Sequence, residues 1–236
     1  MLRNDYLVFG NANTRDYGVG IYGDKLADPP ERDYEYVEIP GKNGDLIIDK
    51  GRYKNKFISY KAYIIDKYAV NIMGLRNALL TQKGYQKLDD TVNPDEFRMG
   101  QVIPFEIDEV GVLKAGEFTI QFNCKPQRYL KSGEAPITFS AAGSIFNQTS
   151  EASKPFLRVY GSGAGTVGIG SETITISAIN SYVDIDCEIM NAFKGATNCN
   201  KDVSFTNDIV LNPGLNGITI TGNITSVEIT PRWFII

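Results

Sequence analysis

Apolar and polar residues alternate along several short stretches of this chain, and that period-2 pattern constrains its fold more than any other feature. The alternation is clearest over residues 118–124, 173–178 and 183–189. A stretch of this kind is typical of a strand with one face in the core and one in water. Turn-forming residues separate the stretches at intervals of about 8–12 residues, as in sandwiches and jelly rolls. The chain is therefore predicted to be mainly β, with a β-sandwich or jelly roll in its second part.

Two turns are predicted from glycine-containing pairs. Gly222-Asn223 separates the strand-like runs 217–221 and 224–229, which favours a two-residue hairpin. Pro40-Gly41-Lys42-Asn43-Gly44 favours a second turn, because Asn43 and Gly44 tolerate a positive φ.

One helix is predicted within residues 71–84. Ile72, Leu75 and Leu79 recur at helical spacing on one face. Asn71 is suited to cap its start and Gly84 to end it.

Charge and aromatic content divide the chain into two parts. Residues 1–130 contain 37 of the charged side chains and eleven of the 13 tyrosines, whereas residues 131–236 contain 15 charged side chains. Between them, Lys131-Ser132-Gly133-Glu134-Ala135-Pro136 is typical of a domain boundary. We therefore expect two domains, residues 1–132 and 133–236.

The composition argues against several functions. The chain has no histidine, which removes the Ser-His-Asp triad and most zinc sites. A net charge of −4 argues against nucleic acid, whose phosphates attract clustered Lys and Arg. Cys124, Cys187 and Cys199 form an odd, sparse set that fits a reducing compartment. We expect no enzyme activity, cofactor, metal, signal peptide or membrane span.

Two motifs allow alternative interpretations. Gly163–Gly168 matches GxGxxG, but a dinucleotide site needs a helix after it, and the following residues continue as a strand. A hairpin or a loop between strands is the favoured interpretation. Asp184, Asp186 and Glu188 share one strand face, so they are compatible with Ca²⁺ binding or glycosidase chemistry. The same three acidic residues are also explained as the polar outer face of a half-buried strand whose inner face places Cys187 in the core, and this interpretation is favoured.

Two surfaces remain as candidate binding sites. Residues 50–56 mix basic and aromatic side chains, and a solvated hairpin end or a protein interface is favoured there over a nucleic-acid groove. Glycan binding would need aromatic platforms, for which the second part offers Tyr160, Tyr182 and Trp233 besides phenylalanines.

An ordered series of short motifs resembles the distal tail protein (Dit) family of long, flexible-tailed bacteriophages. The resemblance covers essentially the whole chain, although Lys42 stands where Arg is common in that family. The matching segments include Tyr6–Asn11, Asp16–Val19, Ile39–Leu46, Tyr53–Asn55, Gly84-Tyr85, Asp89–Thr91, Phe97-Arg98, Phe122–Tyr129, Lys154-Pro155, Tyr160–Gly163, Asp186–Glu188, Asn212–Asn216 and Pro231–Trp233.

The resemblance implies an N-terminal β-rich domain that closes into a hexameric ring, and a galectin-like C-terminal β-sandwich. It implies a structural protein of the virion tail tip, assembled in the host cytoplasm. Its partners would be its own copies, the major tail tube protein, a tail-associated fibre or lysin, and a receptor-binding protein. The rival interpretations are a carbohydrate-binding module for host cell-wall glycan and a carboxylate glycosidase.

The ring contacts are expected in the charge- and Tyr-rich first part, because Tyr and Arg are favoured at protein interfaces. We expect ring formation to reside in residues 1–130 and residues 135–236 to fold as an independent monomer. The expected interface residues are Lys42, Asn43, Arg52, Tyr53 and Lys54.

Overall fold

The computed structural model describes residues 5–22, 29–64, 68–104 and 116–236. The chain forms two compact units, one of residues 1–128 with Ile236, and one of residues 129–235. The division thus falls after Arg128, a few residues before the position at which the sequence composition changes. Both units are built mainly of strands, which confirms the predicted fold class.

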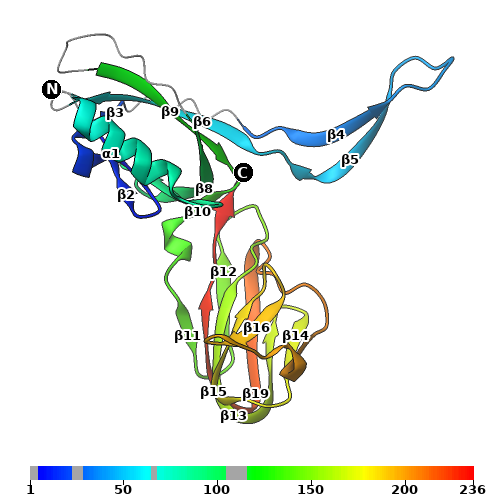
Figure 1. The fold of residues 1–236 in the computed structure, drawn as a ribbon. Coiled ribbons are helices and arrows are strands. Elements are labelled where there is room, and N and C mark those ends of the chain that lie inside the picture. Colours follow the sequence, from blue (N-terminus) through cyan, green and yellow to red (C-terminus); the bar gives the residue numbers. More distant parts are fainter. Residues whose placement is uncertain (1–4, 23–28, 65–67, 105–115) are drawn as a thin grey trace. The chain divides into compact units, whose positions relative to one another are not determined.

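An antiparallel sheet organises the first unit, with the strand order β2-β1-β7-β8-β9-β6-β3. One α-helix, α1 (Tyr68–Leu80), and a short 3₁₀ helix, Thr14–Tyr17, accompany it among the described residues (Figure 1). The strands are β1 (Leu7–Phe9), β2 (Ala12–Asn13), β3 (Val19–Ile21), β6 (Lys56–Ile64), β7 (Gln86–Asp90), β8 (Glu96–Ile103) and β9 (Gly116–Cys124).

The predicted alternation over residues 118–124 is confirmed in β9. Its side chains Phe118, Ile120, Phe122 and Cys124 are buried in the core of the first unit. The strand pairs in register with β6 on one side and β8 on the other. A central strand must bury at least one face, which explains the regular pattern.

Helix α1 buries the three side chains that the spacing predicted. Ile72, Leu75 and Leu79 pack into the core of the first unit. The helix begins at Tyr68, so Asn71 lies inside it and does not cap it, and it ends at Leu80, before Gly84. The local capping signals were misleading because packing of the apolar face, and not the cap residue, sets the extent of most protein helices.

Strands β4 (Arg32–Val37) and β5 (Leu46–Tyr53) form a separate antiparallel ribbon, called the arm below. Within the described residues these two strands pair only with each other. The predicted turn at residues 40–44 is confirmed, with φ of 80° at Gly41 and 81° at Gly44. Figure 1 shows the arm extending from the sheet of its own unit.

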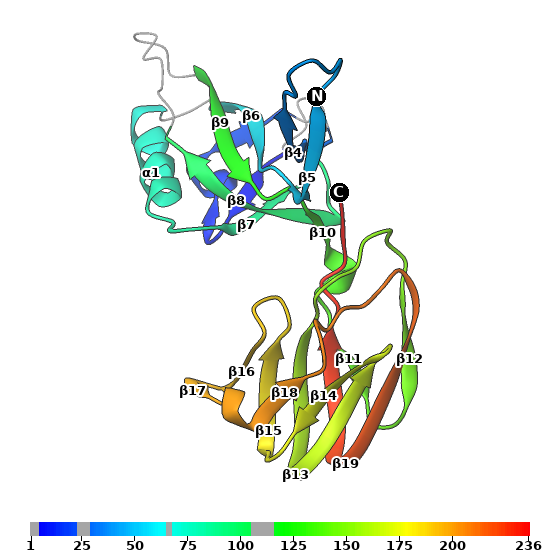
Figure 2. The same cartoon turned by 90° about the vertical axis from the view of Figure 1, so that its right-hand side faces the viewer.

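The second unit is one antiparallel sheet that curls so that both of its halves enclose a single core (Figure 2). Short 3₁₀ helices lie at Lys131–Gly133 and Asn200–Asp202, and the short strands β10 (Arg128–Leu130) and β20 (Phe234–Ile235) pair with each other. The strands of the curled sheet are β11 (Ile137–Phe139), β12 (Gly143–Asn147), β13 (Phe156–Ile169), β14 (Glu172–Ile176), β15 (Asn180–Asp186), β16 (Asn191–Lys194), β17 (Thr197–Asn198), β18 (Val203–Phe205) and β19 (Gly214–Thr230).

Strands β13 and β19 form the frame of this unit. They pair along almost their whole lengths, with register shifts at Gly161 and again before Gly165. Residues 156–161 pair with 224–230 on one side of the shifts, and 165–169 pair with 218–222 on the other. Glycine in a strand commonly marks such a bend, because it lets backbones approach closely.

The two glycine motifs of this region have different outcomes. Gly222-Asn223 is not a hairpin turn, because it lies inside β19, where Gly222 has a φ of 68°. The GxGxxG segment, Gly163–Gly168, lies within β13, and residues 165–169 pair with residues 172–176 of β14 as a β-hairpin, so the hairpin interpretation is confirmed and the loop between strands is not. The next residues form β14 and not a helix, so the geometry of a dinucleotide site is not present.

Candidate functional site

The arm contains or adjoins all five residues that the sequence marked as interface candidates. Lys42 and Asn43 lie in its exposed turn, Arg52 and Tyr53 end β5, and Lys54 follows immediately. The structure thus brings residues from two separate sequence segments onto one exposed hairpin.

Ion pairs link the paired strands of the arm and the residues at its base. Arg32 donates to Asp49 at 2.9 Å and lies 5.1 Å from the Tyr53 ring centroid. Hydrogen bonds from Arg32 and from the backbone N–H of Gly51 lower the pKa of the Asp49 carboxyl. The other pairs are Arg52–Asp33 at 2.7 Å, Lys50–Glu35 at 3.2 Å and Lys54–Glu31 at 3.1 Å.

Both faces of the arm expose large apolar side chains. Tyr36 and Ile47 lie opposite each other on one face and are 61% and 58% exposed. Leu46 and Ile48 on the other face are 50% and 44% exposed. A two-stranded ribbon is at best marginally stable alone in water, and contiguous exposed apolar surface marks interaction sites. Sequence analysis missed these residues because a consecutive apolar run such as residues 46–48 is typical of a buried strand.

A substitution at Gly44 tests the conformation assigned to the turn of the arm. Replacing Gly44 by Val is expected to fray the arm at a cost of about 1–3 kcal/mol, because a β-branched residue is strained at positive φ. Hydrogen exchange of the amides in β4 and β5 measures this, with Asp45→Val as the control. The melting temperature of the first unit should stay unchanged, because the arm pairs only with itself among the described residues. Unaltered exchange in Gly44→Val would contradict the assigned turn.

The acidic residues of β15 are held in ion pairs. Arg158 donates two hydrogen bonds, of 2.6 and 2.8 Å, to the Asp184 carboxylate. Arg232 donates two, of 2.7 and 3.0 Å, to the Asp186 carboxylate. Asp184 is only 4% exposed, so the expected solvated outer face is wrong at this position. The alternation also ends early, since β15 ends at Asp186 and Ile189 is 67% exposed.

These pairs argue against a glycosidase site. Burial by itself raises the pKa of the Asp186 carboxyl, but hydrogen bonding and charge from Arg232 outweigh it, and the net pKa is lowered. The general acid of a glycosidase needs a raised pKa. Burial raises the pKa of the Cys187 thiol to about 12, so this residue is a core side chain and not a nucleophile.

The Asp186–Arg232 ion pair should make the free energy of unfolding depend on pH. Asp186→Asn is expected to cost about 1–2 kcal/mol at pH 7, because it weakens a half-buried charged pair. The pKa of Asp186 is lower in the folded protein than the value of about 3.8 in the unfolded chain. The ion pair therefore stabilises the fold fully above about pH 3.8, and this stabilisation is lost as the pH falls through the lower, folded-state pKa. The variant and wild type should therefore converge below about pH 4 in thermal unfolding. Glu188→Gln, 3.8 Å from Arg232 and half-exposed, is the control. Equal stability at pH 7 would refute the assignment.

In the described part of the chain, the Cys, Asp and Glu side chains form no group of three or more that could hold a metal ion. None of the helices in the described ranges is long and apolar enough to cross a membrane.

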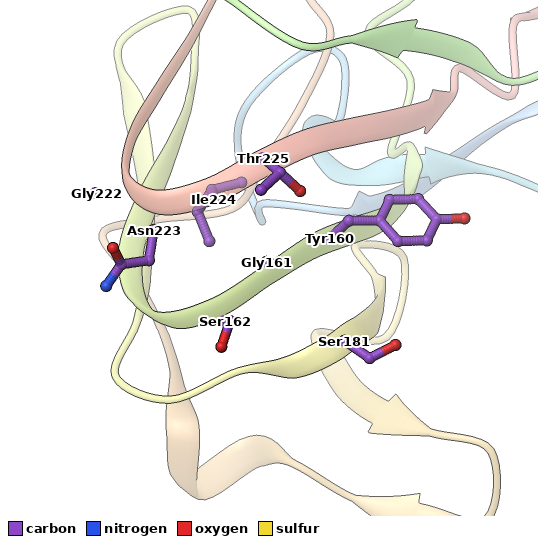
Figure 3. A pocket seen from close by; sticks show the side chains of 8 residues that line it. All are labelled: Tyr160, Gly161, Ser162, Ser181, Gly222, Asn223, Ile224 and Thr225. Carbon is purple, nitrogen blue, oxygen red and sulfur yellow. The ribbon is translucent and has the colours of Figure 1, made fainter.

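A shallow, open hollow of about 650 Å³ lies at the bend of the second unit. Figure 3 shows its lining residues, which come from β13, β15 and β19. They are Tyr160, Gly161, Ser162, Ser181, Gly222, Asn223, Ile224 and Thr225.

Comparison with known proteins finds similarity in structure only. No protein-family model and no curated protein matches the sequence. The Dit protein of phage SPP1, described as a paradigm of the hub adsorption apparatus in phages that infect Gram-positive bacteria, superposes with a TM-score of 0.72. The match covers 98% of this chain and 99% of that one, at 14% identity.

The chain has a Dit-like fold. Two structures of the phage P2 baseplate in its activated conformation, with Ca and with Sr, agree at a TM-score of 0.53. They cover 95% of this chain and 97% of theirs, at 10% and 11% identity. The match runs through both units of the Dit-like chain. At such identity it establishes the fold, and the role has to be argued from the surface.

Proposed function

We propose that this protein is a structural hub of a phage tail tip, and not an enzyme. The observation that carries the proposal is the match of the whole chain, both units included, to the hub protein of SPP1. The ion-paired carboxylates of β15 and the buried Cys187 support a non-catalytic role.

The hub is proposed to be a hexameric ring in which the arm of one copy packs against the next copy. A closed ring needs two different complementary surfaces on each subunit. The arm supplies a surface that the described residues of its own chain leave uncovered, with apolar side chains on both faces. Lys42, Asn43, Arg52, Tyr53 and Lys54 would border that contact as its polar rim.

The ring is proposed to join the major tail tube protein to the tail-associated fibre or lysin and to a receptor-binding protein. Its place would be the tip of the virion tail. The first unit is assigned to the ring, because it carries the arm, and the second unit is proposed to be a galectin-like domain.

Electron microscopy of the purified full chain at high concentration tests the ring. We expect closed six-fold rings that dissociate on dilution, since each contact in a ring of this kind can be modest. Antibodies raised against the chain should label one end of the tail in intact particles. Monomers at every concentration, with labelling of the capsid or along the tail, would overturn the assignment.

A further inference from the structure

Two Asn-Gly pairs occur in the sequence, Asn43-Gly44 at the tip of the arm and Asn216-Gly217 in β19. The side-chain amide of an asparagine can react with the backbone nitrogen of the residue that follows it. The reaction is least hindered when that residue is glycine, which has no Cβ. The two pairs have the same local chemistry, so their surroundings in the fold decide whether each of them reacts.

The surroundings of Asn43 leave its side chain free to move. A turn closed by the hydrogen bond from the N–H of Lys42 to the carbonyl of Ile39, at 3.1 Å, ends just before it. Asn43 and Gly44 are exposed and lie in the loop that joins β4 to β5 (Figure 1). Neither the Asn43 side chain nor the Gly44 N–H hydrogen-bonds to another described residue. A Cβ at Gly44 would meet nothing within 4 Å, so the space beside this nitrogen is open.

The surroundings of Asn216 hold its side chain in place. Asn216 is 3% exposed, and its Oδ1 accepts a hydrogen bond from the N–H of Asn212 at 2.9 Å. Its Nδ2 donates to the carbonyls of Asn212 at 2.8 Å and Gly214 at 3.1 Å. Gly217 is paired with Ser144 in the ladder between β12 and β19. The amide can therefore react only after these hydrogen bonds break and the end of β19 opens, which makes reaction slow.

We propose that Asn43 is a site of spontaneous deamidation, a modification that the exposed tip of the arm undergoes without an enzyme. The backbone nitrogen of Gly44 attacks Cγ of Asn43. The N–Cγ bond forms, the Cγ–Nδ2 bond breaks, and Nδ2 leaves as ammonia with the proton of the peptide nitrogen. Water then opens the cyclic imide, either at Cγ to give aspartate or at the backbone carbonyl to give isoaspartate. The net reaction consumes water and releases ammonia, with no oxidant or reductant.

Both products change the tip of the arm. Each adds a negative charge to a loop that already contains Glu38 and Asp45, with Lys42 as its basic residue. In isoaspartate the main chain also runs through Cβ and Cγ, which lengthens the backbone within the loop. In the proposed ring Asn43 borders the contact between copies, where an added charge mainly slows association. That consequence rests on the proposed function, whereas the deamidation requires only the exposed loop.

Ageing of the purified full chain tests the proposal. Folded protein is kept at mildly alkaline pH, at a concentration too low for copies to associate, and is sampled over time. Digestion with pepsin at acidic pH and mass spectrometry locate each conversion of amide to acid, and chromatography separates isoaspartate from aspartate. We expect conversion at Asn43 at least about tenfold faster than at Asn216, because Asn216 must first lose its hydrogen bonds.

The denatured chain is the matched control for the sequence. In guanidinium chloride both Asn-Gly pairs are exposed, so their rates should agree within about threefold. Asn43→Gln is the control for the position. Its longer side chain places the amide away from the nitrogen of Gly44, so the product at position 43 should disappear while the slow reaction at Asn216 remains.

Equal rates at Asn43 and Asn216 in the folded chain overturn the proposal. It is also overturned if Asn43 reacts more than about tenfold more slowly in the folded chain than in denaturant, because the loop then protects it. Electron microscopy of fresh protein at high concentration tests the ring separately. Conversion of Asn43 in a chain that forms no rings refutes the proposed ring alone, and rings without conversion refute the modification alone.

Discussion

Rings of the full chain should be lost when the apolar face of the arm is made polar. The double variant Tyr36→Lys with Ile47→Glu replaces two exposed side chains that lie opposite each other across the ribbon. Opposite charges at paired positions keep the cross-strand attraction, so the arm itself should persist. What is removed is apolar surface available for burial against a neighbouring copy.

The expected effect is large. Full burial of an exposed large apolar side chain contributes about 1.5–3 kcal/mol. Tyr36 and Ile47 are 61% and 58% exposed, so burying what remains of both contributes roughly 2–3.5 kcal/mol at each contact. That corresponds to roughly a 30- to 400-fold weaker contact, and a closed ring repeats the loss at every interface. Mass in solution and electron microscopy should show monomers at concentrations where wild type forms rings.

A control in the second unit makes this test specific. Phe146→Lys changes a side chain of β12 that is 64% exposed, comparable to Tyr36 at 61%. It should leave the rings intact, and the melting temperature of the double variant should match wild type. Rings in the double variant, or loss of rings in Phe146→Lys, would contradict the assignment of the contact to the arm.

The spacing of apolar residues in the sequence predicted those helices and strands that bury one face along their whole length. Strand β9 has neighbours on both sides, so its apolar residues alternate from Phe118 to Cys124. Helix α1 buries Ile72, Leu75 and Leu79 at the spacing of one helical face. In both cases one face is buried along the whole element, and that condition makes a period visible in sequence.

The bend of β19 could not be predicted in this way. Gly222-Asn223 between two strand-like runs is a hairpin signal only if the chain folds back on itself. Here the strand that pairs with β19 is β13, more than fifty residues earlier in the chain. The glycines of β13 leave room for the backbone of β19 at the bend. The sequence contains both halves of this arrangement, but nothing local connects them.

The candidate site was predictable only in part. Lys42, Asn43, Arg52, Tyr53 and Lys54 stood out because they are basic, aromatic or suited to turns. The exposed apolar residues of the arm did not, since a strand of such residues is normally a core strand. Their exposure follows from the separation of β4 and β5 from the main sheet, a tertiary feature with no local signal.

The bend of the second unit should tolerate no side chain at Gly161. A Cβ there would lie closer than 3.0 Å to the backbone oxygen of Asn223 and near the Cα of Ile224. These are backbone atoms of the paired strand, so relief requires β13 and β19 to separate at the point where both change direction. Gly161→Val is expected to cost about 3 kcal/mol, the upper end of ordinary overpacking. For a unit of this size, its melting temperature should fall by at least about 10 °C.

The same substitution at Gly217 is the matched control. Gly217 also lies in β19, its φ is not positive, and a Cβ there meets nothing within 4 Å. Val favours extended backbone, so Gly217→Val should change the free energy of unfolding by less than about 1 kcal/mol. Thermal unfolding followed by circular dichroism compares the two variants with wild type. If Gly161→Val melts within a few degrees of Gly217→Val, the strands are not in close contact at Gly161, and the proposed shape of the hollow beside them is wrong as well.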